Sequence, residues 1–192
     1  YMDISHVDKA KQYLFEFEQE KMRMSPLLVY PDMKYTQIYN SVISGYLTSN
    51  TKDKGLAQAQ KVLSHMIESH ESNARHIARP NTTSFVPIMS SLANGDGPQR
   101  VERLLSKMES LYQRRNSIPP HFPDAKLVAN VEPNTIACNA VLKAYARVGN
   151  LQSALKLLGR MEKDENLSSA RPDANTHALI STLLSDDSSA KI

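Results

Sequence analysis

The feature that most constrains the fold is a Pro-Asx pair that recurs along the chain. The pairs are Pro31-Asp32, Pro80-Asn81, Pro133-Asn134 and Pro172-Asp173. Proline cannot continue a preceding helix because it lacks a backbone N–H, and Asp or Asn can cap the helix that follows. A stop-and-cap signal that recurs in this way predicts an internal repeat in which each copy begins with a helix.

A short apolar run follows each pair. The runs cover 38–47, 84–92, 136–145 and 176–180. They are apolar on more than one side and contain small residues, as expected of a helix with neighbours on both sides. Pro87 lies near the start of the second run and is expected to delay or kink that helix.

A second, more amphipathic pattern follows a turn signal in each complete unit. A small or apolar residue is followed at i+3, i+4 and i+7 by apolar residues, which places all four on one helical face. The pattern occurs at 59–66, 101–108 and 154–161, each time ending in Met, and again at 10–17 with Phe17 at its end. The Met side chains are expected to belong to the core.

Helices that alternate in this way predict an all-α fold, an α-solenoid of stacked antiparallel helix pairs. The sequence predicts one array over 1–192. Its expected parts are a trailing helix of a broken repeat at 1–32, repeats at 33–81, 82–134 and 135–173, and the first helix of a broken repeat at 174–192. The second repeat carries a long Pro-containing loop. Because an isolated pair cannot bury its apolar face alone, both ends are expected to stack on further repeats of a longer protein.

Composition supports helix and narrows the classes of function. Aromatic residues make up 6% of the 192 residues and Trp is absent, which disfavours a β-sandwich or barrel. The net charge of +3 is compatible with a polyanionic partner and equally with an ordinary protein surface. Cys138 is the one cysteine, so no intrachain disulfide can form, and no apolar run is long enough to span a membrane.

No catalytic or cofactor motif is recognisable. The chain has no glycine-rich phosphate loop, no nucleophile elbow and no His-x-Glu with Cys-x-x-Cys. His65, His70 and His76 do not share a helical face at their spacing, so no metal site is expected. The sequence therefore predicts no enzyme, no cofactor and no small-molecule substrate for this segment, and it leaves open a catalytic domain elsewhere in a longer protein.

Two stretches resemble the pentatricopeptide repeat family. Residues 39–46, Tyr-Asn-Ser-Val-Ile-Ser-Gly-Tyr, resemble the first helix of that family, and 133–161 with the closing Pro172-Asp173 resemble nearly a whole unit. The tetratricopeptide family fits less well, because Trp is absent and the units end in Pro-Asx. The resemblance implies a solenoid that binds single-stranded RNA, one base per repeat. It also implies a mitochondrial or chloroplast protein that acts in RNA processing, stability or translation.

The resemblance further implies which residues read the RNA. In the family, a side chain early in the first helix acts together with the Asx that closes the unit. The corresponding pairs are Asn139 with Asp173, which favours uracil, and Asn40 with Asn81, which suggests a pyrimidine once a three-residue insertion near 33–35 is allowed for.

The remaining family positions are filled unevenly. In the second unit Val86 stands with Asn134, and in the final half-unit Ala178 takes the early position; neither Val nor Ala has a hydrogen-bonding side chain. The aliphatic residue that wedges the base corresponds to Ile136, and the cation that meets phosphate corresponds to Arg147.

Two functions remain open from the sequence. The first is single-stranded RNA binding with a preference for pyrimidines, and the second is a helical scaffold for protein partners whose reading positions have decayed. Asn40 and Asn139 favour the first, since Asn is a mediocre helix former. Val86 and Ala178 favour the second. Each closing Asx could also act as a helix cap alone, and Arg147 as a solvated cation near a helix C-terminus.

Overall fold

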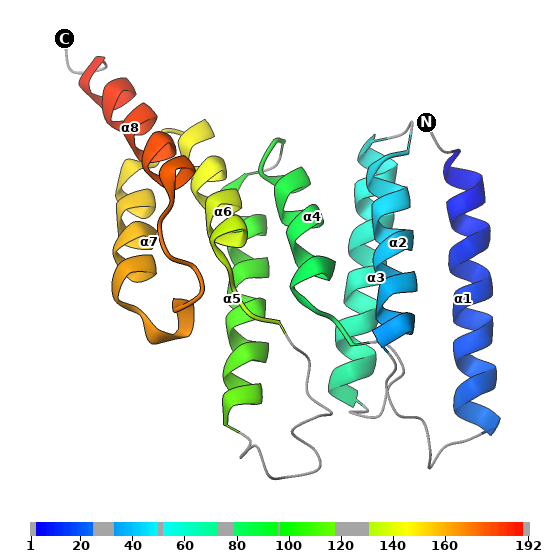
Figure 1. Cartoon of the computed structure of the whole chain (residues 1–192). Helices are drawn as coiled ribbons and strands as arrows, with labels where there is room; N and C mark the ends of the chain where they lie inside the picture. Colours follow the sequence, from blue (N-terminus) through cyan, green and yellow to red (C-terminus); the bar gives the residue numbers. More distant parts are fainter. Residues whose placement is uncertain are drawn as a thin grey trace. The chain divides into compact units, whose positions relative to one another are not determined.

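The structure of the protein is a computed structural model that describes residues 3–24, 33–49, 52–72, 79–95, 97–117 and 131–189 (Figure 1). These ranges contain α-helices, one short 3-10 helix and no strand, which confirms the all-α class. The elements are α1 (Ile4–Met24), α2 (Met33–Leu47), α3 (Lys52–Ser72), α4 (Thr82–Leu92), α5 (Pro98–Asn116), α6 (Thr135–Arg147), α7 (Leu151–Lys163), the 3-10 helix Glu165–Leu167 and α8 (Ala174–Ser189).

The predicted alternation of helices is confirmed in order and type. The four apolar runs lie in α2, α4, α6 and α8, and the amphipathic pattern lies in α1, α3, α5 and α7. The expected delay at Pro87 is wrong, because α4 begins at Thr82 and contains Pro87 in its interior. Asn81 accepts the backbone N–H of Ser84 at 3.0 Å and so starts the helix a turn before the proline.

The described helices fall into two compact units. The first comprises 1–88 with 114–130, and the second comprises 89–113 with 131–192. In the first unit α2 packs against both α1 and α3. In the second unit α6 packs against α7 and α8, and α7 also packs against α8. Within each unit a first helix thus contacts its own partner and a helix of the neighbouring pair, as in stacked helical repeats.

The Met of the amphipathic pattern belongs to the core, as predicted. Met66, Met108 and Met161 are each 0% exposed. The pattern at the N-terminus behaves differently, because Tyr13 is 70% and Phe17 is 47% exposed. The buried face of α1 consists instead of Val7, Leu14 and Glu18, at spacings of seven and four residues. No described helix combines the length and hydropathy that crossing a bilayer requires.

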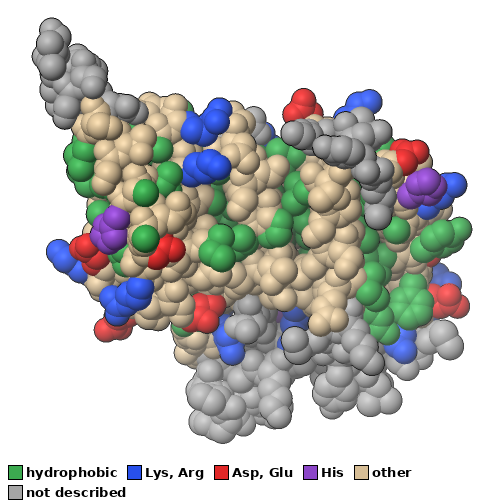
Figure 2. Space-filling view, turned by 45° about the horizontal axis from the view of Figure 1, so that its top comes forward, with side chains coloured by type: hydrophobic (Ala, Val, Ile, Leu, Met, Phe, Trp, Pro, Cys, Tyr) green, Lys and Arg blue, Asp and Glu red, His purple; other side chains and the backbone are tan. Residues whose placement is uncertain are grey.

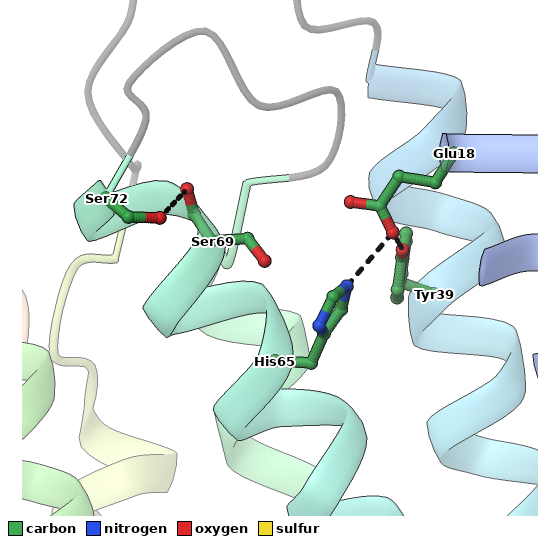
Figure 3. Close-up of polar contacts among 5 residues, drawn as sticks. All are labelled: Glu18, Tyr39, His65, Ser69 and Ser72. Carbon is green, nitrogen blue, oxygen red and sulfur yellow. Dashed lines mark hydrogen bonds and ion pairs between the residues drawn. The ribbon is translucent and has the colours of Figure 1, made fainter. Parts of the chain in front are cut away.

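A buried carboxylate explains why α1 turns this face inward. Glu18 is 3% exposed, accepts a hydrogen bond from the Tyr39 hydroxyl and lies 3.0 Å from Nε2 of His65 (Figure 3). The Phe15 ring lies 4.4 Å from the His65 ring, centroid to centroid. Burial, and then the bond to Glu18, raise the pKa of Tyr39 far above its usual value. Glu18 therefore ties α1 to α2 and α3, since a buried carboxylate is stable only with partners.

We expect Tyr39→Phe to destabilise the first unit by about 1–2 kcal/mol, because it removes a donor from a buried carboxylate. Tyr46→Phe is the matched control on the same helix. The Tyr46 hydroxyl donates to Asp8 at 2.5 Å, and the Asp8 side chain is 48% exposed, so water can replace that bond. Urea unfolding followed by circular dichroism measures both variants. Equal losses would contradict the role given to Glu18.

The buried Cys138 offers a probe of the second unit. Its side chain is 0% exposed on α6, and burial, followed by the negative charge of Glu109, raises the pKa of the thiol to about 12. At pH 8 only about one thiol in ten thousand would then be ionised. We expect a soluble aromatic disulfide reagent to label Cys138 at least roughly a hundredfold more slowly in the folded chain than in guanidinium. Similar rates would show that α6 opens readily.

Candidate nucleic-acid interface

The third repeat brings three polar side chains together where α6 meets the start of α8. Nδ2 of Asn139 donates to Oδ1 of Asp173 at 3.1 Å, and Oγ1 of Thr176 donates to Oδ1 of Asn139 at 2.7 Å. Asn139 is 7% exposed, whereas Asp173 is exposed. The predicted pair Asn139 and Asp173 is therefore in contact, and Thr176 joins it as a third member.

The start of α8 explains why these groups are so placed. Oδ1 of Asp173 accepts the backbone N–H of Thr176 at 2.8 Å, and Oγ1 of Thr176 accepts the backbone N–H of Asp173 at 3.0 Å. This reciprocal pair resembles a capping box, which satisfies N–H groups that a helix end leaves free. Pro172 ends the preceding segment. The cap therefore holds Asp173 and Thr176 in place before either meets Asn139.

The first repeat builds the same arrangement from Asn40, Asn81 and Ser84. Nδ2 of Asn40 donates to Oδ1 of Asn81 at 3.2 Å, and Oγ of Ser84 donates to Oδ1 of Asn40 at 2.7 Å. Oδ1 of Asn81 accepts the N–H of Ser84 at 3.0 Å, and Oγ of Ser84 accepts the N–H of Asn81 at 3.1 Å. We call each set of three, Asn40–Asn81–Ser84 and Asn139–Asp173–Thr176, an amide cluster.

A second repeated contact fixes the register of the two clusters. Four residues before each early Asn, a threonine hydroxyl donates to the carbonyl of the arginine that precedes the Pro-Asx pair. Thr36 bonds the carbonyl of Arg79 at 3.0 Å, and Thr135 bonds that of Arg171 at 2.8 Å. Asn40 and Asn139 thus occupy equivalent places. Residues 33–35 lengthen α2 at its start relative to α6, which accounts for the insertion.

The second repeat lacks an amide cluster. Asn134 caps α6 and its Oδ1 accepts the N–H of Ala137 at 3.0 Å. Ala137 stands where the other repeats have Ser84 or Thr176, so the hydroxyl is missing. The early residue of this repeat, Val86, has no hydrogen-bonding side chain. The structure thus places Asn134 as a helix cap.

A hollow beside Asn139 collects further side chains of the third repeat. Ile136, Asn139 and Lys143 of α6 line it together with residues at the end of α4 and on α8. Ile136 is 58% exposed, so its aliphatic side chain is accessible on this surface. Lys143 and Arg147 are exposed at one and two turns beyond Asn139. Lys143 was missed in the sequence, although its i+4 spacing from Asn139 could have indicated it.

The surface around the amide cluster of the first repeat lacks the aliphatic and cationic side chains found in the third. Counting from Asn40 as from Asn139, the position of Ile136 is taken by Gln37, and those of Lys143 and Arg147 by Ser44 and Thr48. None of these is aliphatic or charged. Figure 2 shows charged side chains scattered over the face that it presents instead of gathered into one basic patch. Recognition by the third repeat would therefore depend on local contacts more than on a long-range field.

The histidines do not form a metal site in the described part of the chain. His65 is paired with Glu18, His70 is buried, and His76 lies outside the described residues. Within the ranges that the structure describes, no three His, Cys, Asp or Glu side chains are grouped so that they could hold a metal ion.

Stacked helix pairs with recurring capped ends define a helical-repeat protein. The family model of the pentatricopeptide repeat domain matches residues 127–166, which include α6, α7 and the residues Asn134, Ile136, Asn139 and Arg147. The match confirms the resemblance that the sequence shows over 133–161: this segment is a pentatricopeptide repeat. Proteins of this family are RNA-binding helical repeats and are generally not catalytic. No curated protein matches the chain.

The amide cluster of the third repeat makes a prediction about pH. The N–H of Thr176, and then the Asn139 amide, lower the pKa of Asp173 below its usual value. Because the folded pKa is depressed, the ionised carboxylate stabilises the fold above the unfolded value, and this stabilisation is lost as the pH falls through the folded value.

We expect Asp173→Asn, which reproduces the Asn81 arrangement, to weaken the fall in stability below about pH 4. Other carboxylates titrate in both proteins, so the difference between parent and variant in urea midpoint, measured from pH 6 downward, isolates Asp173. If the urea midpoints of parent and variant fell in parallel with pH, the hydrogen bonds to the Asp173 carboxylate would not stabilise the fold.

Proposed function

We propose that this chain binds single-stranded RNA with a preference for pyrimidines, and that Asn40 and Asn139 read the bases. The observation that carries the proposal is the recurrence of the amide cluster. Two Asn side chains at equivalent places in α2 and α6 contact a closing Asx and a hydroxyl through the same atoms. One of the two lies in the segment that is a pentatricopeptide repeat.

The chemistry of the cluster supports base recognition. An amide has two N–H donors and two carbonyl lone pairs, and Asn139 uses one of each on Asp173 and Thr176. One N–H and one lone pair remain for the edge of a base. The exposed Ile136 offers an apolar surface for the face of a base, and Lys143 and Arg147 offer positive charge for phosphates.

The wider setting is proposed from the family. Asn139 with Asp173 favours uracil in pentatricopeptide repeats, and Asn40 with Asn81 favours a pyrimidine. We further propose one array over 1–192 with repeats at 33–81, 82–134 and 135–173. We also propose a role in RNA processing, stability or translation in the mitochondrion or chloroplast, because proteins of this family are commonly organellar.

A protein-binding scaffold is the second candidate, and one observation favours it. Tyr13 and Phe17 on α1 and Ile38 on α2 are 70%, 47% and 46% exposed, and the Phe17 ring stacks on Tyr35 with centroids 5.8 Å apart. Exposed apolar side chains gathered in one region are typical of a surface that a protein covers. The second repeat, which has no amide cluster, is compatible with this function too.

We expect Asn139→Ala to reduce the preference for oligouridine over oligoadenosine about three- to tenfold, because it removes hydrogen bonds to a base edge worth about 1 kcal/mol. Helicity by circular dichroism is expected to be unchanged. Asn150→Ala is the control, because Asn150 caps α7 through the N–H of Ser153 and is not part of an amide cluster. Fluorescence anisotropy with labelled strands measures the affinities.

Salt separates the two candidate functions. RNA binding predicts an affinity that falls as salt rises from about 50 to 200 mM, since cations are displaced from the phosphates. Absence of binding to a randomised RNA pool at low salt would contradict the RNA function and leave the scaffold. A preference for uridine that Asn139→Ala leaves unchanged would assign the reading to other residues.

A further inference from the structure

The hydroxyls of Ser84 and Thr176 are the members of the amide clusters that the family resemblance does not account for. Each sits in the first turn of a helix and reaches back to the early Asn of the preceding repeat. Building on the RNA function proposed above, we propose that Ser84 and Thr176 are positioning residues. Each fixes which way round the Asn amide is held, and so sharpens the preference of that repeat for one pyrimidine over the other.

The hydrogen-bond inventory assigns the hydroxyl proton. Oγ1 of Thr176 lies 2.7 Å from Oδ1 of Asn139 and 2.9 Å from Oδ1 of Asp173, and it has one proton to give. Oδ1 of Asp173 already accepts the N–H of Thr176 and Nδ2 of Asn139. The shorter contact is to Asn139, whose Oδ1 has no second donor among the described residues. The proton therefore goes to Asn139.

Both amides are held the same way round. Nδ2 points to the closing Asx and Oδ1 points to the hydroxyl in both clusters. A reversed Asn139 would bring its Oδ1 against the Asp173 carboxylate, where two acceptors repel. It would also turn Nδ2 towards Oγ1 of Thr176, which already accepts the N–H of Asp173. In the first repeat the neutral Asn81 takes the place of the carboxylate, so repulsion against a reversed amide is weaker. The hydroxyl of Ser84 therefore contributes a larger part of the preference for the observed orientation of Asn40.

The direction of the amide matters because uracil and cytosine present opposite patterns. Uracil places a carbonyl acceptor at C4 beside the N3–H donor, whereas cytosine places an amino donor at C4 beside an N3 acceptor. An amide held one way round matches one of these edges, and the reversed amide matches the other. An amide that turns freely therefore accepts both bases, and one that is locked distinguishes them.

The second repeat provides a comparison within the chain. Its early residue is Val86, which has no amide to orient, and the residue at the hydroxyl position of the following helix is Ala137. The hydroxyl thus occurs after the two repeats that have an early Asn and is replaced by a methyl group after the repeat that does not. This is the pairing that an amide-positioning role requires.

Thr176→Val tests the proposal, since it keeps the shape of the side chain and removes the hydroxyl. We expect the ratio of affinities for otherwise identical strands carrying uridine or cytidine to fall roughly fivefold towards one, the factor that a hydrogen bond of about 1 kcal/mol represents. Thr176→Ser restores the hydroxyl and is expected to keep the parent ratio. Ser84→Ala, with Ser84→Thr as its control, is expected to show the larger fall.

The outcomes distinguish positioning from support of the helix. A role in capping alone would lower stability and weaken both strands alike, and so leave the ratio unchanged; that result would overturn the proposal. Equal losses in Thr176→Val and Thr176→Ser would overturn it too. If the parent chain bound RNA with a uridine preference that none of these variants altered, positioning would fail while RNA binding stood. If the parent chain did not bind RNA, both the proposed RNA function and the positioning role would be wrong.

Discussion

The structure depends on the helix caps that Asn81, Asn134 and Asp173 provide, each as the Asx of a Pro-Asx pair. The proline stops the incoming segment, and the Asx side chain accepts an N–H of the next first helix, at 3.0 Å for Asn81 and Asn134 and at 2.8 Å for Asp173. In two of the three repeats the same oxygen also accepts Nδ2 of the Asn one repeat back. One group thus starts a helix and fixes a polar side chain of the neighbouring repeat.

This double use explains how much of the chain could be predicted from its sequence. Proline, Asx caps and i, i+3, i+4, i+7 spacing are local signals, so the alternation of first and second helices and the burial of Met66, Met108 and Met161 could be predicted. The pairing of Asn139 with Asp173 came from the family resemblance, and the contact between them is present. Binding of RNA at this pair stays a prediction.

The features that the sequence did not predict have a common physical reason: most of them depend on contacts between residues that are distant in the sequence. Glu18 is buried because Tyr39 and His65 meet it, and this contact, which helical spacing cannot show, leaves Tyr13 and Phe17 exposed. The start of α4 depends on the box between Asn81 and Ser84, which overrides Pro87. The hydroxyls of Ser84 and Thr176 do carry a local signal, an Asx-x-x-Ser/Thr motif, and it was overlooked.

The repeats differ in how many of the side chains proposed to contact RNA they contain. The third combines an amide cluster with an exposed aliphatic side chain and two cations, the first has the cluster alone, and the second has the cap without a reading amide. Hydrogen bonds to a base edge contribute about 1 kcal/mol each, so a chain with two amide clusters is expected to discriminate modestly between RNA sequences. Its affinity should come chiefly from the third repeat.

The most direct test of this account observes the Asn side chains themselves. Side-chain amide resonances of Asn40, Asn139 and Asn150, assigned by nuclear magnetic resonance, would be followed while oligouridine is added to the chain. The Asn139 resonances are expected to shift most and those of Asn40 to shift as well, whereas those of Asn150, which caps α7, are expected not to shift. Saturating RNA that leaves both Asn40 and Asn139 unmoved would contradict the claim that these amides read the bases.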